Sequence, residues 1–184
     1  MISRYTRPEM GRLWEPENRF QKWLDVEIAV CEAWHELGEI PADALQEIKN
    51  KAAFNIDRID EIEREVKHDV IAFLTSVAEH VGPASRFIHL GLTSSDVVDT
   101  ALSILMREAA DRIIAGLQEL MIVLKDRAYA YQHTPCIGRS HGVHAEPMTF
   151  GLKFALWYAE AERNLVRMQR ARATISVGTI SGAV

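Results

Sequence analysis

The sequence predicts an all-α protein with two parts: a small N-terminal helical domain over residues 1–94 and, over residues 95–184, the first long helices of a helical bundle. Three observations predict this fold class. Apolar residues recur at three- and four-residue steps, and the six prolines and ten glycines punctuate otherwise helical segments. No segment shows the two-residue alternation or the hairpin dipeptides that are typical of strands.

The N-terminal part is expected to contain four helices. The first begins at Pro16, a residue favoured in the first turn, and runs to Gly38. Its apolar face includes Trp23 and Trp34, and we expect all four tryptophans to lie in the core. Three shorter helices follow at 41–52, 59–65 and 69–81, the last of which is ended by a Gly-Pro pair.

The C-terminal part is expected to contain two long helices, at 95–133 and 148–173, joined by a loop. At 1.5 Å per residue the first would be roughly 57 Å long. Amphipathic helices of this length need further helices to cover their apolar faces. We therefore expect the chain to assemble with other copies and to be the front part of a longer protein.

Composition and charge exclude several classes of protein. With 48% hydrophobic and 26% charged residues the chain is globular, and its net charge of −5 argues against nucleic acid or an anionic membrane as a partner. It has neither a membrane-length apolar run nor a signal-peptide core. Cys31 and Cys136 lack metal-type spacing and are interpreted as the reduced thiols of a cytoplasmic protein.

The segment 138–147 between the two long helices is the strongest candidate for chemistry. It carries His141, His144 and Glu146 in a loop between rigid helices, where catalytic groups concentrate. The three could be imagined as metal ligands, but His-x-x-His-x-Glu is not an established zinc pattern, and we expect no metal. The alternative is a polar helix connection whose histidines only cap or hydrogen-bond.

The segment 86–96 places Thr93, Ser94, Ser95 and Asp96 at the start of the longest helix. One of them must cap that helix, because helix N-termini leave N–H groups unpaired. The remaining hydroxyls, beside free N–H groups and the positive end of the helix dipole, would suit a bound carboxylate or phosphate. Capping alone is the alternative.

Two further groups are weaker candidates. In Lys67-His68-Asp69 the aspartate is a plausible N-cap, and the lysine and histidine could be ordinary surface residues. Arg4 and Tyr5 near the N-terminus could grip a phosphate through a guanidinium fork and a phenol hydrogen bond.

Taken together, three segments closely resemble the adenylosuccinate lyase branch of the fumarase/aspartase superfamily. They are KHDVIAF at 67–73, FIHLGLTSSDVVDTA at 87–101 and GRSHGVHAEPMTFGLK at 138–153, and the likeness runs from Arg4 to the final SGAV. Ser140 stands where members often carry threonine, and the hydroxyl is kept. The resemblance implies a helical homotetramer without metal or organic cofactor. It also implies β-elimination of fumarate from adenylosuccinate, giving AMP, and from the succinylcarboxamide imidazole ribotide intermediate of purine biosynthesis.

The resemblance also implies roles for individual residues. His141 is similar to the general acid that protonates the leaving nitrogen, and His68 to its helper near the substrate phosphate. An imidazole suits proton transfer because its pKa lies near the operating pH. The implied substrate-binding residues are Arg4, Tyr5, Lys67, His68, Asp69, His89, Thr93 and Ser94.

One family feature has no match in the chain. Members take their general base, a serine, from a loop of the pattern Ser-Ser-x-Met-Pro-x-Lys-x-Asn, and each active site combines segments of three subunits. The chain therefore resembles an N-terminal portion that is inactive alone, with the base beyond residue 184. The alternatives are another fumarate-releasing lyase of the superfamily and a non-catalytic helical assembly module.

Overall fold

The computed structural model describes residues 2–182, and their contacts divide the chain into two compact units. The first unit spans Met1–Met106 and Ser176–Val184, and the second spans Arg107–Ile175. The predicted domain boundary at 94–95 concerns the domains of a whole protein and stays a prediction. The two predicted domains begin at residue 1 and end at residue 184. Residues 1, 183 and 184 lie outside the described residues, and the last two of them also end the SGAV match.

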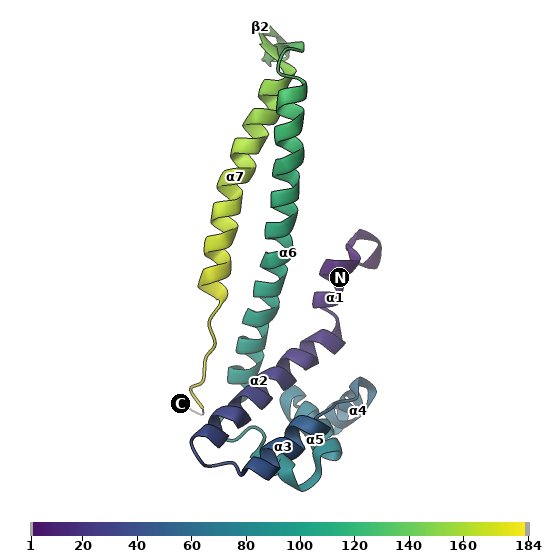
Figure 1. Ribbon diagram of the computed structural model, residues 1–184. Helices are drawn as coiled ribbons and strands as arrows, with labels where there is room; N and C mark the ends of the chain where they lie inside the picture. The colour runs from purple at the N-terminus through teal and green to yellow at the C-terminus, as the bar shows by residue number, and fades with distance from the viewer. Residues whose placement is uncertain (1, 183–184) are drawn as a thin grey trace. The chain divides into compact units, whose positions relative to one another are not determined.

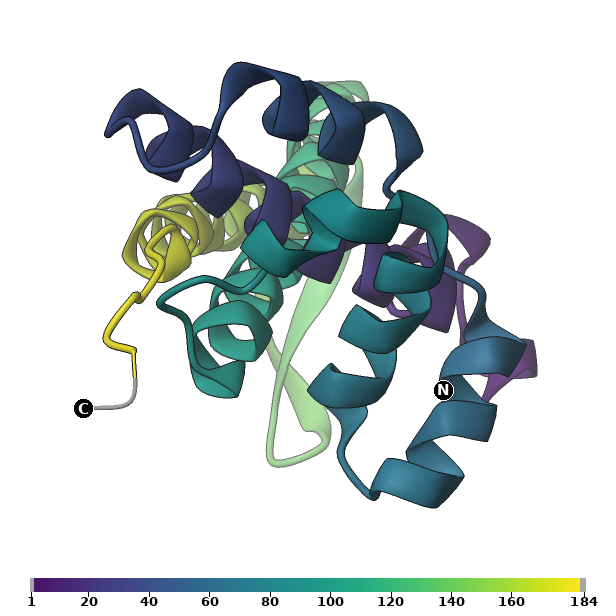
Figure 2. The same cartoon turned by 90° about the horizontal axis from the view of Figure 1, so that it is seen from below.

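The first unit is built from short helices (Figures 1 and 2). In chain order these are η1 (Ser3–Tyr5), α1 (Pro8–Leu13), α2 (Pro16–Glu36), α3 (Ala42–Lys51), α4 (Ile56–Val66), α5 (Asp69–Val81), η2 (Gly82–Phe87) and the first turns of α6 (Ser94–Ala130). The four helices predicted here are confirmed. The short elements η1 and α1 were not predicted, because six residues or fewer cannot display a helical period.

An aromatic cluster forms the centre of this unit. The rings of Phe20 and Phe73 stack with centroids 5.7 Å apart, and Trp23 packs edge-on against both. The prediction that all four tryptophans are core residues is wrong for two of them. Trp14 is 39% exposed at the end of the short α1, and Trp157 is 49% exposed on a face of α7 that the second unit leaves uncovered.

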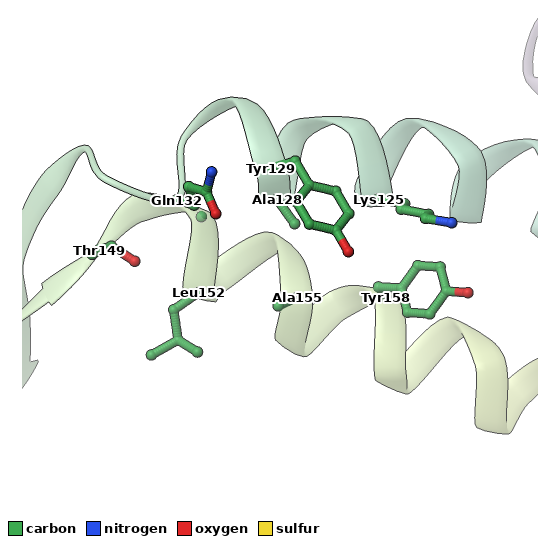
Figure 3. A pocket seen from close by; sticks show the side chains of 9 residues that line it. Lys125, Ala128, Tyr129, Gln132, Thr149, Leu152, Ala155 and Tyr158 are labelled. Carbon is green, nitrogen blue, oxygen red and sulfur yellow. The ribbon is translucent and has the colours of Figure 1, made fainter.

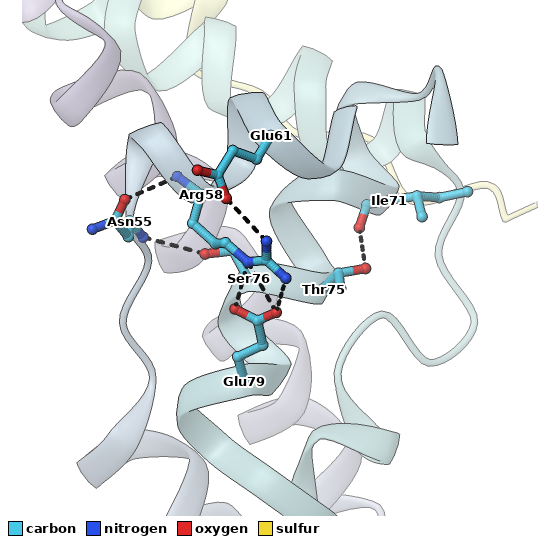
Figure 4. Close-up of polar contacts among 7 residues, drawn as sticks. All are labelled: Asn55, Arg58, Glu61, Ile71, Thr75, Ser76 and Glu79. Carbon is cyan, nitrogen blue, oxygen red and sulfur yellow. Dashed lines mark hydrogen bonds and ion pairs between the residues drawn. The ribbon is translucent and has the colours of Figure 1, made fainter. Parts of the chain in front are cut away.

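Helices α4 and α5 lie side by side, joined only by residues 67 and 68 (Figure 2). Polar contacts hold the start of α4 against α5 (Figure 4). Asn55 caps α4 by accepting the N–H of Arg58, and its own N–H donates to the buried hydroxyl of Ser76. The Arg58 guanidinium donates to Glu79 and lowers the pKa of that carboxyl. These contacts tie the two helices together at the end of the pair that lies away from the connecting residues 67 and 68.

The second unit contains the rest of α6 and the whole of α7 (Phe150–Ile175), which run side by side (Figure 1). Both predicted long helices are confirmed. An ion pair between Asp111 and Arg172 joins them, and it lowers the pKa of the Asp111 carboxyl.

The prediction of a loop between the long helices is wrong. The segment is an antiparallel hairpin of β1 (Pro135–Ser140) and β2 (Val143–Thr149). Its two-residue turn is His141-Gly142, and both residues have positive φ, 52° and 78°. Positive φ at both central residues is typical of the type I′ turn, whose twist matches that of paired strands. The strands are short and mostly exposed, and a register shift interrupts them, so no apolar alternation reveals them in the sequence.

At the base of this hairpin the backbones of α6 and α7 approach closely at Gly151. Its N–H donates to the Tyr131 carbonyl, and a Cβ placed on it would lie 2.7 Å from the Cα of Gln132. Beside this contact is a hollow of about 450 Å³, shown in Figure 3, whose lining includes Lys125 and Tyr129 from α6 and Leu152 and Tyr158 from α7. None of the predicted site residues lines it.

Large apolar side chains remain exposed on both helices of the second unit. They are Ile113, Leu120, Ile122, Val123, Tyr129, Leu152, Leu156, Trp157 and Val166. Within residues 2–182 no helix combines the length and the apolarity that crossing a membrane requires.

We expect Gly151→Ala to lower the free energy of unfolding by about 1–3 kcal/mol, because the added methyl overlaps backbone atoms of α6 that cannot move aside. Gly116→Ala is the matched control: it lies in α6 with no atom within 4 Å of a new Cβ. That substitution should raise stability by up to about 1 kcal/mol. Urea denaturation of the two variants measures the difference, and equal effects would contradict the close approach at Gly151.

Candidate functional site

Three residues other than glycine have a positive φ within residues 2–182, and each lies in one of the three sequence motifs. They are Lys67 at 56°, His89 at 68° and His141 at 52°. A side chain in this left-handed region costs free energy, and such residues cluster at functional sites, where the surrounding structure enforces them. All three were predicted as site residues from the sequence.

The backbone at His89 is held by a buried carboxylate on α2. Glu27 is 1% exposed, and its Oε2 accepts the N–H of His89 at 2.9 Å. Its Oε1 lies 2.6 Å from Nδ1 of the same histidine. One carboxylate thus fixes both the main chain and the ring of His89.

Two more α2 side chains hold the same segment. The Cys31 thiol donates to the Phe87 carbonyl at 3.7 Å, and the Trp34 indole N–H donates to the Leu90 carbonyl at 2.8 Å. Burial, helped by the nearby Glu27 carboxylate, raises the pKa of Cys31 to about 12, so the thiol keeps the proton that it donates. Residues 27, 31 and 34 are four and three positions apart and so share one face of α2.

The contribution of this α2 face was missed in the sequence. A signal was present, because Glu27 is an acid placed among the apolar residues of an otherwise buried stripe. A carboxylate is seldom fully buried without a partner, so its position predicts one, although not which one.

The carboxylate of Asp96 holds the other end of the segment. It is 1% exposed and accepts the N–H of Thr93, just before α6, at 2.9 Å. It also accepts the N–H groups of Ser181 and Gly182, at 2.9 and 3.0 Å. Together these donors hold the pKa of the Asp96 carboxyl below its usual range.

The four polar residues at the start of α6 therefore divide their tasks. Asp96 binds back to the residue before the helix, as in half of a capping box. The described contacts include no hydrogen bond from the hydroxyl of Thr93 or of Ser94, and both residues are half-buried. The described contacts of Asp96 reach the residue before the helix and residues 181 and 182, so the hydroxyls of Thr93, Ser94 and the exposed Ser95 stay available to another acceptor at a helix N-terminus.

In the Lys67-His68-Asp69 motif, the prediction that Asp69 caps α5 is wrong. The N-cap is His68, whose Nδ1 accepts the N–H of Ile71 at 3.4 Å, while Asp69 is the first helical residue. The same Nδ1 lies 3.5 Å from a carboxylate oxygen of Asp69. Lys67, in its left-handed conformation, ends α4. Lys67 and His68 are the whole connection between α4 and α5, and Asp69 is the first residue of α5.

Arg4 and Tyr5 are the last residues of η1, and the guanidinium carbon of Arg4 lies 4.9 Å from the centroid of the Tyr5 ring. The Tyr5 side chain is 76% exposed. Both polar groups are thus accessible, in line with the predicted phosphate contact, which stays a prediction.

His141 occupies the tip of the β1–β2 hairpin and is exposed, as are His144 and Glu146 on β2. The Arg139 guanidinium donates to the Gly142 carbonyl across the turn at 3.5 Å. In the part of the chain that the structure describes, no three His, Cys, Asp or Glu side chains gather as a metal site would require.

The predicted site residues fall into separate groups. His89, Thr93 and Ser94 share one segment of the first unit. No described hydrogen bond joins this segment to residues 67–69 or to η1. His141 belongs to the second unit. The meeting of all three motifs in one site stays a prediction.

The family follows from comparison with known proteins. Residues 3–184 match the model of a protein family described as Lyase. The chain belongs to this lyase family. It is 52% identical over 184 residues to adenylosuccinate lyase of Bacillus subtilis and 56% identical over 184 residues to that of Synechocystis. All of this chain is aligned in both cases, and it spans 43% of each relative's length.

A solved structure agrees with this assignment. The chain superimposes on the crystal structure of fumarate lyase from Mesorhizobium with a TM-score of 0.89 and 28% identity, over 95% of this chain and 42% of that one. These findings confirm the predicted fold class and the resemblance on which it partly depended.

We expect Asp96→Asn to lower the melting temperature by several degrees at neutral pH, because an amide cannot accept all the donors that the carboxylate binds. A lowered native-state pKa stabilises the fold above the usual pKa of about 4 and ceases to do so as the pH falls through the lowered value. The difference from wild type should therefore shrink in acid.

The matched control is Asp99→Asn, an exposed aspartate one turn further along α6. Thermal unfolding followed by circular dichroism near neutral pH and again well below pH 4 measures both variants. A deficit of Asp96→Asn that is the same at both pH values would contradict the assigned role of its charge.

Proposed function

We propose that the protein carrying this chain is an adenylosuccinate lyase. It would eliminate fumarate from adenylosuccinate, leaving AMP, and perform the equivalent cleavage on the succinylcarboxamide imidazole ribotide intermediate of purine biosynthesis. The observation that carries the proposal is the enforced left-handed backbone in each of the three motifs, in a chain more than half identical to proteins of that name.

His141 is the proposed general acid. Elimination breaks a carbon–nitrogen bond, and the departing nitrogen needs a proton, which an imidazole can supply near neutral pH. The hairpin turn supports this role, because it presents the ring at an exposed tip on a backbone fixed by strand pairing. His68, the N-cap of α5, is the proposed helper.

The start of α6 is the proposed site for the succinyl carboxylate. The described contacts include no hydrogen bond from the Thr93 or Ser94 hydroxyl, and a helix N-terminus favours an anion. His89 precedes them on the same segment. Lys67, Asp69, Arg4 and Tyr5 would complete the binding of the nucleotide, with the cation of Arg4 suited to its phosphate.

The complete site would form in a cytoplasmic homotetramer without metal or organic cofactor. The exposed apolar faces of the second unit are of the kind that bundle helices of other copies cover, and the exposed His141 could then reach residues of a neighbouring subunit. The serine general base would come from outside these 184 residues, so we expect this chain alone to release no fumarate.

The substrate is tested with the full-length protein, by following fumarate release from adenylosuccinate and from argininosuccinate. We expect turnover of adenylosuccinate alone. Preference for argininosuccinate would indicate another fumarate-releasing lyase. Release from neither, together with an assembled oligomer, would favour the helical assembly module.

His141→Ala in the full-length protein should lower kcat by about 100-fold or more, the usual contribution of a positioned acid. His144→Ala, on the same hairpin with no assigned role, is the control and should keep near-normal turnover. Fumarate release by His141→Ala at the control's rate would overturn the assignment of the acid.

A further inference from the structure

We propose that Glu27 is a positioning residue that fixes the tautomer and direction of the His89 ring, so that Nδ1 carries a proton and Nε2 is the nitrogen offered to the substrate. The proposal builds on the proposed function, in which His89 binds substrate. It adds a residue from α2, which none of the three motifs contains.

The geometry leaves the Glu27 carboxylate committed to one residue. Its two oxygens lie 2.9 Å from the N–H and 2.6 Å from Nδ1 of His89, and the described contacts give it no other hydrogen bond. The carboxylate is 1% exposed, and the His89 side chain is 23% exposed. A buried carboxylate without its partner is strongly unfavourable, so this pair is held tightly.

The chemistry of the pair determines which nitrogen is protonated. An ionised carboxylate can only accept hydrogen bonds, so Nδ1 at 2.6 Å must be the donor. The two ring nitrogens point in diverging directions, so Nε2 faces away from Glu27. In a neutral ring Nε2 is an acceptor; in a cationic ring paired with Glu27 it is a charge-assisted donor, suited to a substrate carboxylate.

The place of His89 in the segment fits this role. It lies four residues before Thr93, and its left-handed backbone is held by the same carboxylate that holds its ring. The contact to the main-chain N–H fixes the backbone of His89, and the contact to Nδ1 fixes the direction of its ring as well.

Glu27→Gln separates these two contacts. The His89 N–H requires an oxygen, so the glutamine NH2 faces Nδ1 and makes it an acceptor, which moves the ring proton to Nε2. In the full-length protein we expect kcat/KM for adenylosuccinate to fall by about 10-fold or more, as for other histidines in the wrong tautomer. Glu32→Gln is the control: this glutamate of the same helix is half-buried and paired with Lys49, and the variant should stay within about 2-fold of wild type.

A double-mutant cycle with His89→Ala distinguishes positioning from structural support. Because Glu27 acts through the ring, Glu27→Gln should have no further effect on kcat/KM once the ring is absent. If it causes its full loss in the His89→Ala background as well, Glu27 supports only the main chain and the proposal is overturned.

The ring proton itself gives a test that needs no activity. With 15N-labelled histidine in the full-length protein, multiple-bond proton–nitrogen spectra report the protonated nitrogen of the neutral ring, and His89→Ala assigns the signal. We expect Nδ1–H in wild type and Nε2–H in Glu27→Gln. Nε2–H in wild type would overturn the proposal even if the variant failed to fold. Absence of adenylosuccinate turnover would instead defeat the proposed function, and the spectra would still decide the role of Glu27.

Discussion

Two buried carboxylates, one from α2 and one from α6, hold the segment that runs from η2 into α6. Glu27 accepts the main-chain N–H of His89, and Asp96 accepts that of Thr93. Both acids are almost inaccessible to water, so each hydrogen bond is made where no solvent competes for it. The segment between them, which bears the hydroxyls proposed to bind an anion, therefore has its two ends fixed independently of any ligand.

Core packing and site geometry are coupled through α2. The same helix contributes Phe20 and Trp23 to the aromatic cluster and, a turn later, the face that holds His89 and its neighbours. A change in how Trp23 packs against Phe73 would shift the helix and with it the buried carboxylate. Substitutions deep in the aromatic cluster thus reach, through α2, a segment proposed to bind substrate that they never touch.

The helices could be predicted from the sequence because their apolar faces repeat over many turns. The hairpin could not, since its strands are exposed and its turn uses histidine where asparagine or aspartate is usual. The three motifs indicated candidate site residues, but not which neighbours hold them. Glu27 and Asp96 act on residues 62 and 85 positions away, and such partners are fixed only by tertiary structure.

The hydrogen bonds from Ser181 and Gly182 to Asp96 also constrain how the protein is made. A growing chain emerges at roughly 5–20 residues per second, so the 85 residues between Asp96 and Ser181 separate these partners by about 4–17 s of translation. For that time the acid that orders the start of α6 lacks two of its donors. In a nascent chain, the start of α6 therefore lacks these two hydrogen bonds until α6, the β1–β2 hairpin, α7 and residues 181 and 182 have all left the ribosome.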